Sequence, residues 1–62
     1  DKLIKKYENR IKDLEASLDR SQKNLTEAKL NNQDTSIFTT SNSVILAQIQ
    51  IYTYVVEDLK HD

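Results

Sequence analysis

The chain contains neither glycine nor proline in 62 residues. At average usage of about 7% Gly and 5% Pro, a globular domain of this length would hold roughly seven of them, largely in tight turns. Both residues also interrupt helices, so their absence favours long helices over a fold built from many short elements. The sequence therefore predicts an all-α protein.

A chain this short has little surface to bury. As a monomer it would bury only about 60% of what its unfolded state exposes, which leaves an isolated core marginal. Disulfide bonds and structural metals usually support such small domains, but the chain has no Cys and a single His, His61. We therefore expect association with other chains, with no cofactor and no metal.

Charge and apolar residues divide the chain into three segments. Residues 1–30 carry most of the charged groups, residues 31–43 are almost entirely Asn, Thr and Ser, and residues 44–62 are rich in Ile, Val and Tyr. We expect these to be a coiled-coil segment, a polar stretch and a second apolar helical segment.

A heptad repeat runs through the first segment. It predicts a narrow apolar stripe, typical of a helix that supercoils with one partner, interrupted only by Ser21. Glu8 with Lys12, and Asp19 with Lys23, have the i,i+4 spacing that stabilises a helix by about 0.2–0.5 kcal/mol per pair. Arg10 and Glu15 occupy g and e positions, which favours a parallel in-register partner. The expected oligomer core here is Ile4, Tyr7, Ile11, Leu14, Leu18, Leu25 and Ala28.

The third segment has a similar 4-3 spacing and is apolar nearly all round. Helices of this kind are buried among several neighbours, so we expect the coiled coil to widen here into a bundle. A β-strand is the competing interpretation, because β-branched and aromatic residues dominate, although it would be unusually long. The expected core is Ile45, Ile49, Tyr52, Val56 and Leu59, and the expected partner surface beside it is Ile51, Tyr54 and Val55.

The polar stretch leaves two arrangements open. One is a single continuous helix whose core is weakened by polar residues, forming a parallel homo-oligomeric coiled coil. The other is a linker followed by a second helix, capped by Ser41 or Ser43, that folds back on the first. The absence of Gly at a helix end favours the continuous helix.

Residues 4–28 resemble the coiled-coil rods of scaffold and cytoskeletal proteins. The resemblance implies a structural homo-oligomerisation segment of a larger protein, with a homodimer expected first and a trimer or tetramer as alternatives. An adapter whose residues 44–59 dock a different protein is the second hypothesis.

Other classes of function find little support in the residues. Glu57 and Asp58 are adjacent on a helix and cannot converge as an acid–base pair, so we expect no enzyme. The net charge of −1 and the single basic cluster, Lys2, Lys5 and Lys6, favour neither nucleic acid nor membrane as a partner. The absence of Cys predicts an intracellular location, cytoplasmic or nuclear.

Overall fold

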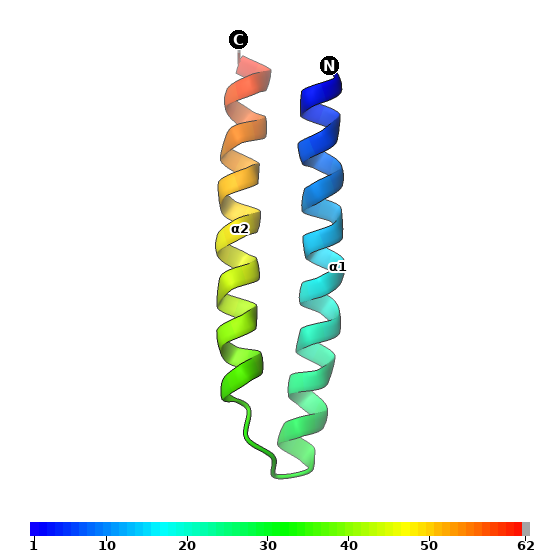
Figure 1. Ribbon diagram of the computed structural model, residues 1–62, viewed down its shortest axis with the longest axis vertical. Coiled ribbons are helices and arrows are strands. Elements are labelled where there is room, and N and C mark those ends of the chain that lie inside the picture. Colours follow the sequence, from blue (N-terminus) through cyan, green and yellow to red (C-terminus); the bar gives the residue numbers. More distant parts are fainter. Residues whose placement is uncertain (62) are drawn as a thin grey trace.

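The computed structural model describes residues 1–61 and consists of two helices, α1 (Lys2–Leu30) and α2 (Ser36–His61), with no strand in that range. In Figure 1 the chain turns once, and α2 runs back alongside α1 so that both ends of the chain lie together. The molecule is a narrow rod of 49 × 14 × 11 Å. The all-α prediction is confirmed, and the strand interpretation of the third segment is wrong.

Helix α1 covers almost all of the predicted coiled-coil segment. The carboxylate of Asp1 accepts a hydrogen bond from the backbone N–H of Leu3 at 2.8 Å, which caps the first turn. Asp19 and Lys23 form the expected ion pair at 3.4 Å. Glu8, expected to pair with Lys12, instead lies 3.2 Å from the ammonium group of Lys60 in α2.

Helix α1 ends in a Schellman motif built without glycine. The N–H of Gln33 donates to the carbonyl of Ala28 at 2.8 Å, and the N–H of Asn32 donates to the carbonyl of Lys29 at 3.2 Å. This geometry requires a left-handed residue at position 32, and Asn32 supplies it with φ 56°. Asparagine tolerates this conformation better than most residues because its short polar side chain forms local hydrogen bonds.

Helix α2 begins with a side-chain turn at Asp34. One carboxylate oxygen of Asp34 accepts hydrogen bonds from the backbone N–H of Ser36 at 3.0 Å and from its hydroxyl at 2.7 Å. The carbonyl of Thr35 then accepts the N–H of Thr39 at 3.0 Å, which starts the helical ladder. Both bonds from Ser36, the backbone one first, lower the pKa of the Asp34 carboxyl because they stabilise its charged form.

The polar stretch is therefore mostly helical in this single-chain structure. Only residues 31–35 lie outside a helix, whereas residues 36–43 belong to α2, which begins before Ser41 and Ser43. The hydroxyls of Thr39, Ser43 and Thr53 donate hydrogen bonds to the carbonyls four residues earlier, at 2.7–3.1 Å. These polar side chains therefore find hydrogen-bond partners within the helix itself. The expectation of one helix running through all of residues 31–43 differs from this arrangement at residues 31–35.

Candidate functional site

The predicted core positions of both helices lie along the line where α1 and α2 meet, which we call the seam. Leu14, Ala28 and Val56 are buried there. The other predicted core residues are half-buried, and none is exposed: Ile4, Tyr7, Ile11, Leu18, Leu25, Ile45, Ile49, Tyr52 and Leu59. Within one chain, the two heptad stripes therefore face each other.

Two seam residues of α2 are not among the predicted core residues. Phe38 and Asn42 are both half-buried and precede Ile45 on the same face. The signal was present, because the intervals from Phe38 to Asn42 and from Asn42 to Ile45 continue the 4-3 spacing of the third segment towards the N-terminus. The heptad frame of α1, continued through the polar stretch, reaches Asn42 but not Phe38, because the frame shifts between the two helices.

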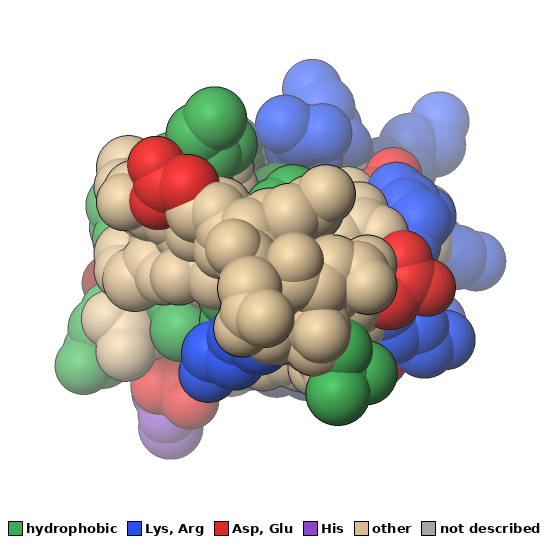
Figure 2. Space-filling view, turned by 90° about the horizontal axis from the view of Figure 1, so that it is seen from below, with side chains coloured by type: hydrophobic (Ala, Val, Ile, Leu, Met, Phe, Trp, Pro, Cys, Tyr) green, Lys and Arg blue, Asp and Glu red, His purple; other side chains and the backbone are tan. Residues whose placement is uncertain are grey.

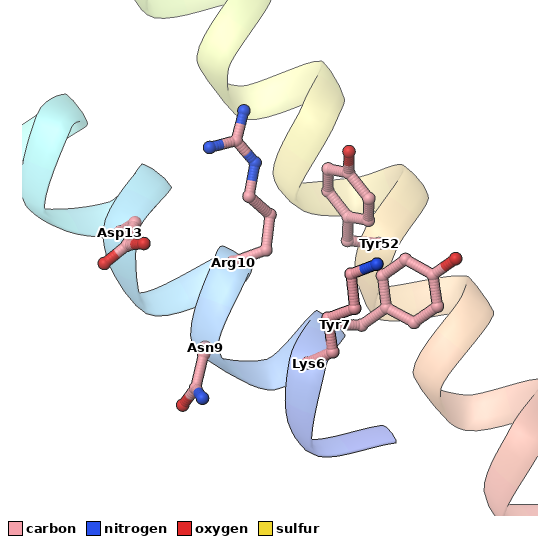
Figure 3. A pocket seen from close by; sticks show the side chains of 6 residues that line it. All are labelled: Lys6, Tyr7, Asn9, Arg10, Asp13 and Tyr52. Atoms are coloured by element: carbon pink, nitrogen blue, oxygen red, sulfur yellow. The ribbon is translucent and has the colours of Figure 1, made fainter. Parts of the chain in front are cut away.

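Two tyrosines form the aromatic contact at the open end of the seam. The ring centroids of Tyr7 and Tyr52 are 5.6 Å apart with planes tilted by 31°, within the range in which aromatic pairs attract. Both rings line a pocket shared with Lys6 and Arg10 (Figure 3). Asn9 and Asp13, which also border it, point away from α2 in this view. The pocket thus has an aromatic floor and a mixed-charge rim, with no converging pair of acid and base.

A polar position interrupts the seam on each helix. Ser21 and Asn42 are both half-buried at positions where the heptad would place an apolar residue. The side-chain oxygen of Asn42 is buried and has no hydrogen-bond partner among the described residues. An unpaired polar atom of this kind destabilises the folded chain, so the seam is weakened at its end nearest the turn.

Large apolar side chains remain in solvent, mainly on α2. Ile37, Ile51 and Tyr54 are 74%, 61% and 68% exposed, and Val44 and Leu46 are also exposed. Of the predicted partner surface, Ile51 and Tyr54 are thus open to solvent, whereas Val55 is half-buried. Seen from the turn in Figure 2, the Lys and Arg side chains stand mostly over the α1 side of the molecule.

The side chains that could act in catalysis or bind a metal ion do not gather into one site. His61, Glu57 and Asp58 are all exposed at the end of α2. Within residues 1–61, no cluster of three or more His, Asp or Glu side chains is placed to hold a metal ion. Neither helix carries an apolar stretch long enough to span a bilayer within that range. The apolar surface of α2 is therefore the candidate functional site.

Comparison of the chain with protein-family models, with curated proteins and with solved structures found no match.

Proposed function

We propose that this chain is a self-association segment, which holds copies of its own protein together through the apolar surface of α2. The observation that carries the proposal is the imbalance between buried and exposed apolar residues. Among the described residues, Leu14, Ala28 and Val56 form the whole of the buried core, while Ile37, Ile51 and Tyr54 stay largely in solvent. A small domain without disulfides would become more stable if a partner covered such an apolar surface.

The proposed associating unit is the hairpin of α1 and α2, in place of a continuous parallel rod. Several contacts support this choice: the Schellman turn at Asn32, the Tyr7–Tyr52 ring pair and the Glu8–Lys60 ion pair all require α2 to fold back. In a parallel rod the seam residues of α1 would pack against the same residues of another copy, and these three contacts would be lost within the chain.

Sedimentation equilibrium at micromolar chain concentration tests self-association. We expect a mass of at least two chains, and the mass of a single chain would contradict the proposal. Because association raises stability by mass action, the melting temperature should also increase with chain concentration.

A distance measurement tests the hairpin separately. Spin labels at Lys6 and His61, in a doubly labelled chain diluted into unlabelled chain, report the distance within one molecule. A hairpin keeps it below the 49 Å length of the molecule, whereas one continuous helix would separate the labels by about 80 Å. The long distance would leave self-association intact and overturn the hairpin.

An adapter that docks a different protein through residues 44–59 is the second candidate. It is favoured by the exposure of Ile51 and Tyr54 side by side on one face of α2. If the chain sediments as a monomer, and a bound protein is lost with Ile51→Lys but kept with Gln50→Lys at an exposed polar position, the adapter function replaces self-association.

A further inference from the structure

A second heptad stripe runs along α2, separate from the seam, and we call it the outer stripe. Its members repeat at intervals of three and four residues, the spacing at which side chains pack against a partner helix in a coiled coil. All are exposed: Ile37, Thr40, Val44, Ala47, Ile51 and Tyr54. At 3.6 residues per turn, its centre lies about 140° around the helix from the seam positions. Helix α2 therefore offers one apolar stripe to α1 and another to solvent.

The outer stripe, from Ile37 to Tyr54, has no charged residue within it. No Asp, Glu, Lys or Arg occurs between Asp34 and Glu57. By contrast, the outward positions of α1 are densely charged and would lose their hydration if another helix covered them. A second α2 is thus a better partner for the outer stripe than the outer face of another α1.

The order of residues along the outer stripe favours an antiparallel partner. When the stripe is laid against a reversed copy of itself, Ile37 meets Tyr54, Thr40 meets Ile51, and Val44 meets Ala47. Each large residue then meets a residue of a different size, whereas a parallel copy would set Tyr54 against Tyr54 and Ala47 against Ala47.

Charge at the ends of the outer stripe supports the same orientation. The next stripe position after Tyr54 is Asp58, with Glu57 beside it. A parallel partner would place these carboxylates opposite their own copies, which is unfavourable. The antiparallel partner instead places the Glu57–Asp58 pairs of the two copies at opposite ends of the interface.

The exposed area agrees with one such interface. The described chain exposes 4970 Å², whereas a compact monomer of 7.2 kDa would expose about 4,100 Å². The excess, roughly 850 Å², is close to the ~800 Å² per partner that a standard stable interface covers.

We infer that two copies of the hairpin pair through antiparallel contact of their outer stripes, forming a nearly flat row of four helices with the two α2 helices at its centre. This inference rests on the proposed self-association and assigns its partner, interface and orientation. The isologous contact closes on itself, so assembly stops at two chains.

Disulfide trapping tests the orientation, and the natural chain contributes no thiol of its own. Chains carrying Ile37→Cys and Tyr54→Cys are mixed in equal amounts, oxidised and identified by mass spectrometry. We expect the mixed disulfide to exceed either symmetric one at least tenfold, because two copies of position 37 would lie about 26 Å apart, far beyond the reach of a disulfide. Predominant symmetric disulfides, or a statistical mixture, would overturn the antiparallel arrangement.

A matched pair of variants tests the surface independently of the thiols. Ile51→Lys places a charge in the outer stripe, and Gln50→Lys places one at an exposed polar position outside both stripes. We expect the first to raise the dimer dissociation constant at least 100-fold and the second less than about threefold, with helicity by circular dichroism retained in both. A dimer that tolerates Ile51→Lys would overturn the inference and leave self-association standing, whereas a wild-type monomer would overturn both.

Discussion

Helices α1 and α2 are almost equally long, at 29 and 26 residues, yet they present different surfaces to solvent. Outside the seam, α1 is covered by Lys, Arg, Asp and Glu, whereas α2 has no charged side chain before Glu57 and exposes Ile37, Val44, Ile51 and Tyr54. Each helix contributes one narrow apolar stripe to the seam. The proposed pairing of α2 with a second copy would account for this difference, since only α2 has an uncharged apolar surface left in solvent.

Two leucine substitutions test whether α1 has a second apolar face. Leu14→Ala removes a buried seam side chain and should lower the free energy of unfolding by about 2–5 kcal/mol. Leu30→Ala removes the same atoms from a position that is 78% exposed, and its effect should stay within about 0.5 kcal/mol. Urea unfolding followed by circular dichroism, at one fixed chain concentration, measures both.

Equal losses of unfolding free energy in these two leucine variants would contradict the difference between α1 and α2. They would mean that the exposed side of α1 is also covered in the assembled protein, and that the charged face does not exclude a neighbour.

The turn that separates the two helices depends on a single backbone conformation. Asn32→Val places a β-branched residue at φ 56° and should destabilise the chain by about 1–2 kcal/mol. Asn32→Gly is the matched control, since glycine adopts this conformation freely and should leave stability unchanged or slightly higher. Thermal melts of the two variants check this, and a valine variant as stable as the glycine one would mean that α1 does not need this turn.

Much of the helical structure could be predicted from residue spacing, but the connection between the helices could not. The stripes of α1 and α2 were visible as 4-3 repeats, and even the β-branched composition of α2 did not hide its helical period. The sequence leaves a fold-back arrangement open beside the continuous helix, and the absence of Gly favours the continuous helix because glycine is the usual left-handed residue at a helix end. In the structure Asn32 takes that position. A heptad stripe specifies the width of a contact and not which chain supplies the partner, so the spacing alone did not distinguish a partner within the chain from one in another copy.

Replacing Asn42, the polar seam residue of α2, should increase stability, with a smaller effect than the substitutions above. Asn42→Leu should raise the free energy of unfolding by about 1 kcal/mol, because it removes a buried oxygen that has no partner among the described residues. Asn24→Leu, at an exposed position of α1, is the control and should change stability by less than about 0.5 kcal/mol. Loss of stability in the Asn42 variant would show that its carboxamide gains a partner in the assembled protein.

The smallest expected effect lies at the start of α2, where the helix depends on a carboxylate. The bonds from Ser36 lower the pKa of Asp34 in the folded chain, so its contribution to stability is present above the unfolded value of about 3.9. That contribution is lost as the pH falls through the lower folded pKa. Asp34→Asn keeps an acceptor oxygen for the turn but cannot titrate, and the other carboxyl groups are common to both proteins. The melting temperature of wild type relative to Asp34→Asn should therefore fall between pH 5 and pH 2, and a constant difference across that range would show that the Asp34 charge does not stabilise the turn.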